Sequence, residues 1–319
     1  MRRNFRVKVL VTGGAGFIGR WVVNQLLLDN HEVWVLDNLS NGQAQNLAEF
    51  MGQENLKAFI QGDIQNGPLL DEIFKLPLDI CYHLAASINV QDSIDDPKTT
   101  FNNDVVGTFN LLERCRSRGT KMVFMSTCMV YAQAQSDQGI SEQWPTKPAS
   151  PYAGAKIAGE NLVLSYYYAY RLPVVVLRPF NTYGPFQKSS GEGGVVAIFI
   201  QRNLQGETLN IYGDGTQTRD LLYVEDCARF VTMAGYSEKA NGQILNAGLG
   251  RDISINDLAG LIAGSTEQIR HVPHIHPQSE VRKLLCDYSK AKSILGWEPE
   301  VSLEEGIRRT EAWIRDKER

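Results

Sequence analysis

The stretch VKVLVTGGAGFIG at residues 7–19 decides the fold of this chain. Val7 to Val11 is a nearly continuous run of β-forming apolar residues, which is typical of a strand buried on both faces. Glycines spaced by three follow at positions 13, 16 and 19, and an amphipathic helix is predicted from Arg20 to Leu28. The pattern therefore predicts a strand, a tight glycine turn and a helix in succession.

Each of the three spaced glycines has its own task. Gly13 permits the tight turn, Gly16 lets the backbone approach a pyrophosphate, and Gly19 lets the helix pack on the strand. The helix N-terminus then faces the phosphates, where free N–H groups favour negative charge. The spacing G-x-x-G-x-x-G is a variant of the dinucleotide fingerprint, and the flanking strand and helix supply its required context. The stretch is thus predicted to bind a dinucleotide.

An acidic residue at the end of the second strand indicates which dinucleotide. Glu32 to Leu36 is predicted to be a strand that ends at Asp37, about twenty residues past the glycines. A carboxylate there suits a bidentate contact to the hydroxyls of the adenosine ribose, and it would repel a 2′-phosphate. The sequence therefore favours NAD over NADP.

The order of the predicted elements indicates the fold class. Further strands are predicted at Leu56–Gln61, Leu78–Ala85, Lys121–Met125 and Pro173–Leu177, with helices between them such as Leu69–Leu76. Beyond residue 184, helices are predicted at Ile255–Ala263 and Leu303–Lys317. This alternation implies an α/β fold with a Rossmann-type, doubly wound parallel sheet. We expect an NAD-binding domain at residues 1–183 and a smaller C-terminal substrate-binding lobe at residues 184–319. Some segments of the lobe, such as Gln243–Ala247, are expected to return to the first domain.

Composition narrows the class of protein. The 319 residues are 43% hydrophobic and carry a net charge of −4, which argues against a nucleic-acid-binding surface. Five cysteines without a C-x-x-C motif suggest reduced thiols and a cytoplasmic location. Neither a signal peptide nor a membrane-spanning segment is predicted. We also expect no metal centre, because His271, His274 and His276 lie in a proline-rich setting without a fourth ligand pattern.

Tyr152 and Lys156 are the candidate catalytic pair. They stand four residues apart in a predicted helix, so the phenol and the ammonium lie on one face. A nearby cation favours the ionised phenol, and we therefore expect Lys156 to lower the pKa of Tyr152 so that it can accept a proton from a sugar hydroxyl. Ser150 and Pro151 suit the cap and the first turn of this helix. Ser126 and Thr127 follow a strand, where substrates of such sheets bind.

Taken together, these residues resemble the nucleotide-sugar epimerase/dehydratase family of extended short-chain dehydrogenases/reductases. The resemblance covers nearly the whole chain. The ordered motifs that carry it are 12–19, Asp37-Asn38, Gly62-Asp63, His83-Leu84-Ala85-Ala86, Ser126-Thr127, Tyr152 to Lys156, 178–185, Gly213-Asp214-Gly215, Arg219-Asp220 to Asp226, and Leu295-Gly296-Trp297.

The resemblance implies roles for individual positions. Thr127 would hydrogen-bond the C4 hydroxyl, Tyr152 would be the base, and Lys156 would bind the nicotinamide ribose. The residues implied at NAD are Gly13, Gly16, Phe17, Ile18, Gly19, Asp37, Asn38, Ser40, Asp63, Ile64, Leu84, Ala85, Ala86, Tyr152, Lys156 and Phe180. Those implied at the nucleotide-sugar are Ser87, Asn181, Val195, Tyr212, Arg219 and Arg282.

Departures from the family pattern select among its reactions. Sugar 4,6-dehydratases of the family carry Asp-Glu after the threonine, and decarboxylases carry a glutamate, whereas this chain has Cys128 and Met129. Asp104 also stands where asparagine is usual, and Arg282 substitutes for an arginine missing near Pro277. A UDP-sugar 4-epimerase needs only Thr127, the tyrosine–lysine pair and NAD. The alternatives are a 4,6-dehydratase and a non-catalytic NAD-sensing protein.

The resemblance also implies a homodimer, in which the Tyr152 helix and the helix before it form a four-helix contact. Tyr166, Tyr167, Tyr168 and Tyr170 are expected at this interface. The sugar and the nucleotide base are left open, because their contacts come from the loop after Gly184 and from residues 272–285.

Overall fold

The computed structural model describes residues 6–134, 138–189, 194–273 and 281–317. Seven parallel strands form the main sheet, in the order β10-β6-β5-β4-β1-β2-β3. This is the doubly wound order with one strand added beyond β6. The strands are β1 (Lys8–Thr12), β2 (Glu32–Asp37), β3 (Leu56–Gln61), β4 (Ile80–His83), β5 (Lys121–Met125), β6 (Val174–Pro179) and β10 (Gln243–Ala247). The predicted fold class is confirmed.

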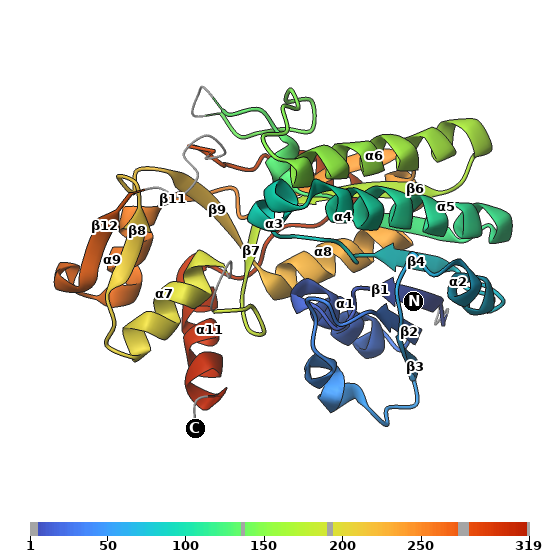
Figure 1. Ribbon diagram of the computed structural model, residues 1–319, viewed down its shortest axis with the longest axis horizontal. Helices are drawn as coiled ribbons and strands as arrows, with labels where there is room; N and C mark the ends of the chain where they lie inside the picture. Colours follow the sequence, from blue (N-terminus) through green and yellow to red (C-terminus); the bar gives the residue numbers. More distant parts are fainter. Residues whose placement is uncertain (1–5, 135–137, 190–193, 274–280, 318–319) are drawn as a thin grey trace.

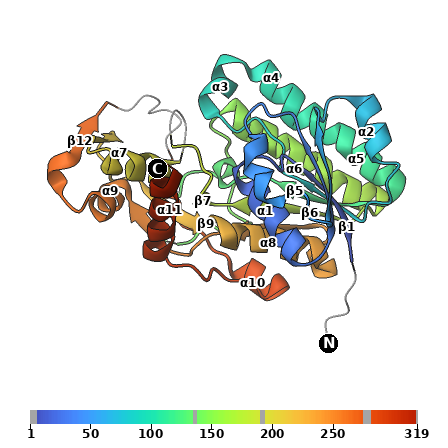
Figure 2. The same ribbon diagram turned by 90° about the horizontal axis from the view of Figure 1, so that it is seen from below.

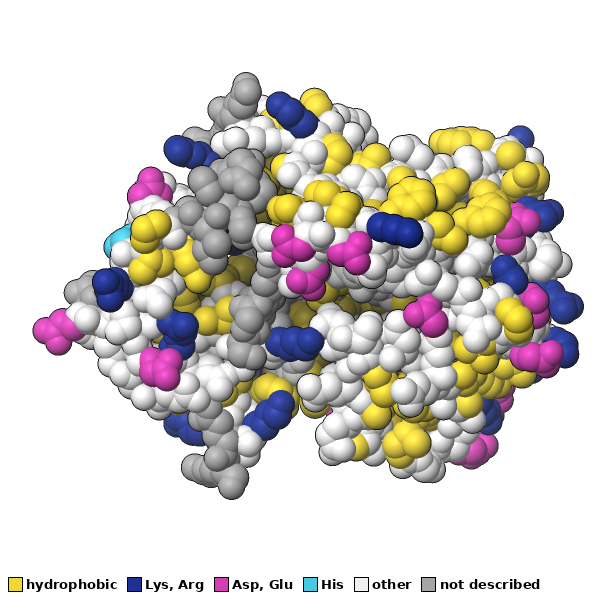
Figure 3. All heavy atoms as spheres, in the orientation of Figure 1, with side chains coloured by type: hydrophobic (Ala, Val, Ile, Leu, Met, Phe, Trp, Pro, Cys, Tyr) yellow, Lys and Arg dark blue, Asp and Glu magenta, His cyan; other side chains and the backbone are white. Residues whose placement is uncertain are grey.

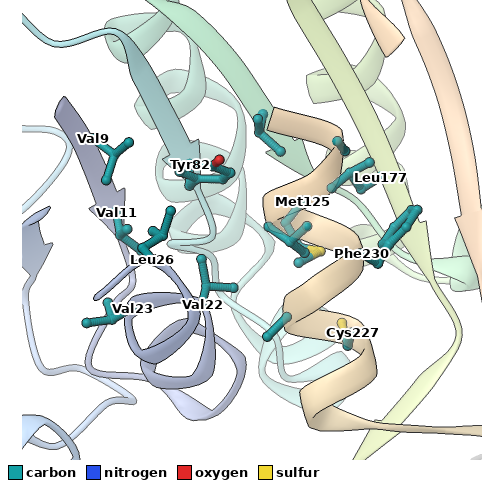
Figure 4. Close-up of a cluster of buried hydrophobic side chains, with 14 of the residues drawn as sticks. Val9, Val11, Val22, Val23, Leu26, Tyr82, Met125, Leu177, Cys227 and Phe230 are labelled. Atoms are coloured by element: carbon teal, nitrogen blue, oxygen red, sulfur yellow. The ribbon is translucent and has the colours of Figure 1, made fainter. Parts of the chain in front are cut away.

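Strand β1 is buried on both faces, as its apolar run predicts. Val9 and Val11 point toward helices α1 (Phe17–Leu28) and α8 (Val224–Tyr236), while Leu10 joins the core on the opposite face. Figure 4 shows this first core, where side chains of β1, α1 and α8 meet. A strand that contributes side chains to a core on each face of the sheet has a fixed register, because a slip of one residue would move every side chain to the opposite face.

Helices α2 (Gly67–Ile73), α5 (Gly107–Arg118) and α6 (Pro151–Tyr170) contribute to the core on the other face of the sheet (Figure 1). The short helices α3 (Val90–Asp95) and α4 (Pro97–Phe101) precede α5, and a π-helical turn at Asn102–Val106 joins α4 to α5. π-helical turns of this kind occur frequently at functional sites.

The C-terminal lobe is a separate cluster of short elements, drawn beside the main sheet in Figures 1 and 2. It contains α7 (Val195–Leu204), α9 (Ile255–Ala263) and α11 (Leu303–Lys317), which bury one hydrophobic core. Strands β8 (Leu209–Tyr212) and β12 (Ile269–Val272) pair in parallel. Strands β7 (Asn181–Tyr183), β9 (Thr218–Tyr223) and β11 (Asp252–Ser254) form a three-stranded sheet. β9 also leads directly into α8, so this small sheet connects the lobe to the first core.

Three elements that follow residue 184 belong to the first core. Strand β10 pairs with β6, α8 packs on α1, and the segment around α10 (Ser289–Leu295) contributes Ala291 and Trp297 to the same cluster. The Trp297 indole is fully buried and donates a hydrogen bond to the Asp226 carbonyl at 3.1 Å. Our division of the chain at residues 183 and 184 stays a prediction, and the chain crosses between the two parts more than once.

Helix boundaries differ from the predictions where capping was overlooked. α1 begins at Phe17 rather than Arg20, directly after Gly16. α2 begins at Gly67 rather than Leu69, because the Asn66 side chain accepts from the Leu69 N–H and Pro68 favours the first turn. In contrast, the predicted Ser150 cap of α6 is confirmed, since its hydroxyl accepts from the Ala153 N–H at 3.2 Å.

Within the described residues, no helix combines the length and the apolar character needed to cross a membrane.

Candidate active site

A pocket of about 770 Å³ lies at the carboxyl ends of the main strands and reaches into the C-terminal lobe. This volume is in the upper part of the range for small-molecule sites. The predicted residues that line it are Gly13, Gly16, Phe17, Ile18, Gly19, Asp37, Asn38, Ser40, Ile64, Leu84, Ala85, Ala86, Thr127, Tyr152, Lys156, Phe180, Asn181, Val195, Tyr212 and Arg219.

Backbone sterics shape the glycine loop. Gly13 has a φ of 72°, and a Cβ there would lie 2.6 Å from the Ala85 nitrogen. A Cβ on Gly19 would lie 2.0 Å from the Gly13 carbonyl oxygen. In the described part of the chain, no side chain caps the N-terminus of α1 at Gly16 or competes there for its first N–H groups. The loop therefore offers bare backbone donors to a phosphate group.

Asp37 is buried beside this loop. Its Oδ2 accepts the Ala15 N–H at 3.0 Å, and its Oδ1 accepts the Leu39 N–H at 2.8 Å. Each carboxylate oxygen has a second lone pair, so the side chain can still accept from ribose hydroxyls. These donors, the bare helix terminus and the acidic side chain fit NAD.

His83 stabilises the strand end that faces the glycine loop. Its two ring nitrogens lie 2.8 Å from the Thr12 Oγ1 and 3.0 Å from the Thr108 Oγ1. Burial and the nearby Lys156 lower the pKa of His83 to about 3, so the ring is neutral and its role is structural. Thr12 in turn accepts the Ala85 N–H at 3.3 Å, which positions the pocket wall at residues 84–86.

Tyr152, Lys156 and Thr127 meet in the pocket. The Lys156 ammonium lies 5.9 Å from the centre of the Tyr152 ring and donates to the Met125 carbonyl at 3.1 Å. The Thr127 side chain is hydrogen-bonded to the Tyr152 phenol. The helix and the end of β5 thus place a phenol, a hydroxyl and an ammonium at one wall of the pocket.

The pKa of Tyr152 differs from the expected direction. Burial raises it, the Asp104 carboxylate raises it further, and the hydrogen bond from Thr127 opposes both effects. The pKa of Tyr152 is therefore raised rather than lowered, because the loss of hydration has the largest effect on the phenol and Asp104 adds to it. Burial likewise lowers the pKa of Lys156, while Asp104 and Glu160 oppose that shift.

A buried ion pair involves the same helix that carries Tyr152 and Lys156. Arg178 binds the Glu160 carboxylate through two nitrogens, at 2.8 and 2.5 Å, and both side chains are nearly inaccessible to solvent. Burial opposes the charge of Arg178, but Glu160 outweighs it and raises the pKa of the guanidinium. Ser126 donates its hydroxyl proton to the same carboxylate. The Ser126 hydroxyl is therefore committed to this pair, whereas Thr127 lines the pocket beside Tyr152.

The lobe side of the pocket is suited to an anion. Val195 begins α7, whose N-terminus has no side-chain cap among the described residues, and Asn181 lines the same pocket. The Arg219 guanidinium lies nearby and donates to the Val281 carbonyl at 2.7 Å. A helix N-terminus, an amide and a guanidinium together can bind a diphosphate.

Three predicted residues do not line the pocket. Asp63 accepts from the Asn38 amide at 2.8 Å, so it orients a lining residue. Ser87 donates its N–H to Asp104 at 2.7 Å. Arg282 is exposed, and its carbonyl accepts from the Thr218 N–H at 2.9 Å.

The histidines considered for a metal do not form a described cluster. His271 is hydrogen-bonded to Asn256 at 2.9 Å, and His274 and His276 lie outside the described residues. In the described ranges, no group of three or more metal-binding side chains gathers.

Several lining residues were missed by the sequence analysis. Asn103, Gln187, Asn210 and Gln217 are polar, and Ile88, Val90, Ile198, Phe199, Ile211 and Ile255 are apolar. Most of them belong to short elements of the lobe or to the segment after β4. Only Asn103, next to the Asp104 that departs from the family pattern, was a usable signal.

The fold and the site define an enzyme of the extended short-chain dehydrogenase/reductase class. A sequence model described as "GDP-mannose 4,6 dehydratase" matches residues 10–310, and the chain belongs to this family of NAD-dependent nucleotide-sugar epimerases and dehydratases.

Individual relatives span the family's activities. The chain is 38% identical to a UDP-glucose 4-epimerase of Mycolicibacterium smegmatis, over 98% of this chain and 99% of the relative. A solved structure called Pal, from Bacillus thuringiensis, is 68% identical with a TM-score of 0.96 and covers 98% of this chain and 100% of its own. A Thermotoga maritima UDP-glucose 4-epimerase, solved with UDP-glucose, is 36% identical with a TM-score of 0.91 and the same coverage. Similar proteins also include UDP-glucuronic acid decarboxylases and an NAD-bound dTDP-glucose 4,6-dehydratase.

Proposed function

We propose that the protein is an NAD-dependent UDP-sugar 4-epimerase. The observation that carries this proposal is a complete C4 oxidation set, Thr127, Tyr152 and Lys156, in the pocket, together with Cys128 and Met129 at the two positions after Thr127, where neither side chain is a carboxylate. Relatives named UDP-glucose 4-epimerase support the nucleotide and the reaction, and relatives solved with NAD support the cofactor. NAD, when bound, supplies a reversible hydride acceptor.

The chain's own residues would divide the remaining work. The N-terminus of α7, Asn181 and Arg219 hold the diphosphate, so that the sugar reaches the wall formed by Thr127 and Tyr152. Thr127 orients the C4 hydroxyl, and Tyr152 removes its proton as C4 is oxidised. The 4-keto sugar then turns within the pocket, and Tyr152 returns the proton to O4 after the opposite face of C4 has been reduced.

The residues after Thr127 oppose the dehydratase alternative. Loss of water from C5 and C6 needs an additional acid and base. Cys128 is buried and the pKa of its thiol is raised to about 12, so it remains protonated, and Met129 has no titratable group. A dehydratase would therefore need proton-transfer groups from elsewhere.

The test is proton NMR of the purified protein, without added cofactor, mixed with UDP-, dTDP- and GDP-sugars. We expect a new anomeric signal from a C4 epimer of equal mass. A 6-deoxy-4-keto product would instead identify a dehydratase, and a complete absence of turnover would favour the non-catalytic NAD-sensing alternative.

Replacing Tyr152 by phenylalanine tests the assigned base. We expect turnover to fall by about 10²- to 10⁴-fold while NAD stays bound, because the ring keeps its packing and loses only the proton acceptor. Bound NAD is measured chromatographically after denaturation. Near-normal turnover of Tyr152→Phe would contradict the mechanism.

We also propose a cytoplasmic homodimer that packs through α4, α5 and α6. Phe101, Phe109, Tyr168 and Tyr170 are exposed on these helices, and Figure 3 shows apolar atoms gathered over them. Tyr166, in contrast, is buried in the core beneath.

Light scattering at micromolar protein should give twice the mass of the chain, and Phe109→Asp should lower it by placing a charge in the contact. A monomeric mass for the parent protein would reject the dimer.

The five cysteines are buried free thiols, which supports a reducing compartment.

A further inference from the structure

Asp104 is a buried carboxylate that the proposed reaction does not use. It lies in the π-helical turn at Asn102–Val106 and is 2% exposed. Its Oδ1 accepts the Ser87 N–H at 2.7 Å and the Asn103 amide at 3.1 Å. Its Oδ2 is also buried but has no hydrogen-bond partner within the part of the chain that the structure describes. One oxygen of this carboxylate, Oδ1, is thus held by the Ser87 and Asn103 donors, whereas Oδ2 is buried without a hydrogen bond among the described residues.

The π-helical turn that carries Asp104 packs against α6, the helix that carries both Tyr152 and Lys156. The charge of Asp104 stabilises the Lys156 ammonium and opposes ionisation of the Tyr152 phenol. Lys156 in turn stabilises the Asp104 carboxylate against the effect of burial, which by itself raises the pKa of Asp104. The other titratable groups that act on the pair are Glu160 of the same helix, His83 of β4 and Cys128 after β5.

The charges around Lys156 limit how many anionic side chains can be ionised beside it. His83 and Cys128 are neutral, and Glu160 is paired with Arg178. Lys156 therefore remains as the cation for two possible anions, the Asp104 carboxylate and the Tyr152 phenolate. Two like charges in a desolvated site do not ionise independently, because each opposes the other.

We propose that Asp104 is a positioning residue that sets the charge of the Tyr152–Lys156 pair. While ionised, it holds Lys156 as an ammonium and Tyr152 as a neutral phenol, and its neutralisation releases Tyr152 to act as a base. This role rests on the proposed function, since it takes Tyr152 as the base. It also explains why an acidic side chain can replace the asparagine that the family resemblance leads one to expect.

A purely structural role predicts a different pattern of variants. If Asp104 only holds the Ser87 N–H, then Asp104→Asn should behave like the parent, because the amide oxygen can still accept that bond. Asp104→Ala should then be the only damaging change. If the charge matters, both variants should shift the ionisation of Tyr152 in the same direction.

The experiment follows Tyr152 directly, without a substrate. The protein, with whatever cofactor it retains, is labelled with ¹³C at the tyrosine ring carbon that bears oxygen. It is titrated by NMR from neutral pH to the highest pH at which the fold persists, because the pKa of Tyr152 is raised above the ordinary tyrosine value. Tyr152→Phe identifies the signal among 12 tyrosines. Asp95→Asn is the charge-matched control, since Asp95 is exposed on α3 and does not line the pocket.

We expect Asp104→Asn and Asp104→Ala to ionise Tyr152 about one pH unit lower than the parent, and Asp95→Asn to match the parent. The rise of turnover with pH should move in the same direction. A Tyr152 signal in Asp104→Asn that follows the parent, or ionises at higher pH, would overturn the proposal. Because the titration needs no turnover, a failed 4-epimerase assignment would appear only as a missing C4 epimer.

Discussion

The two halves of the pocket are built in different ways. On the cofactor side, Gly13, Gly16, Gly19 and Asp37 come from one β1–α1–β2 unit. On the side proposed for the substrate, Asn181, Val195 and Arg219 come from three separate elements, β7, α7 and β9. The first half is therefore encoded locally, whereas the second exists only after the lobe has closed onto the main sheet.

The contacts that hold each half differ accordingly. In the glycine loop the Gly16 N–H donates to the Gly13 carbonyl at 3.1 Å, a bond between near neighbours. On the substrate side, the Asp220 carboxylate accepts the N–H groups of Leu249 at 2.6 Å, Gly250 at 2.9 Å and Cys286 at 3.0 Å. Asp220, which follows Arg219, thus joins two remote segments, at residues 249–250 and at Cys286, to β9. A local change should damage the first half, while the second half depends on residues far away in sequence.

Among the substitutions that test this difference between the two halves, Gly19→Ala should have the largest effect on NAD binding and turnover. The added Cβ would lie 2.0 Å from the Gly13 carbonyl oxygen, so the backbone of the loop must move. We expect the purified protein to lose its bound NAD and its turnover. The free energy of unfolding should also fall by about 1–3 kcal/mol, as for other overpacked sites. Retained NAD is measured after denaturation, and stability by chemical denaturation.

Gly260→Ala is the matched control for that change. Gly260 lies inside α9 of the lobe, and an added Cβ would meet no atom within 4 Å. Alanine is the better helix former, so we expect a gain of about 0.5–1 kcal/mol and unchanged NAD content. A Gly19→Ala protein that keeps its NAD would mean that the loop is not the cofactor site.

Arg219→Lys should have a smaller and more selective effect. Lysine keeps the charge but loses the planar pair of donors. A charge-assisted hydrogen bond contributes about 1.5–3 kcal/mol, so KM for the nucleotide-sugar should rise about 10- to 100-fold. NAD content should not change. Steady-state kinetics on the substrate found by NMR measure this effect.

Arg202→Lys provides the control on the same side of the molecule. Arg202 lies on α7, donates to the Thr208 carbonyl at 3.1 Å and does not line the pocket. We expect it to leave KM unchanged. Equal changes in the two variants would show that Arg219 acts through the stability of the lobe rather than through the diphosphate.

Sequence patterns located the elements of the main sheet well. β3 and β5 begin and end at the predicted residues, as do α9 and α11 in the lobe. Apolar periodicity carries this information, because each element must bury one face or both. The predictions were weaker where a cap or a turn decides the boundary, as at α1 and α2.

Site residues on helices were predicted better than site residues in loops and short strands, because only regular elements have a fixed side-chain periodicity. Motif spacing placed Tyr152 and Lys156 on one helix, since side chains four residues apart share a face. It could not place Arg282 outside the pocket or Asn210 and Gln217 inside it, because loop paths and short strands decide those positions.

The sequence by itself determined the strand–glycine–helix unit, the position of Asp37 and the tyrosine–lysine pair. Each follows from backbone sterics or helical spacing over a few residues. Only the tertiary structure decided the electrostatics of the pair. The pKa of Tyr152 depends on its burial and on Asp104, which lies in another helical segment. The amino-acid sequence alone shows neither the loss of hydration at Tyr152 nor the proximity of Asp104.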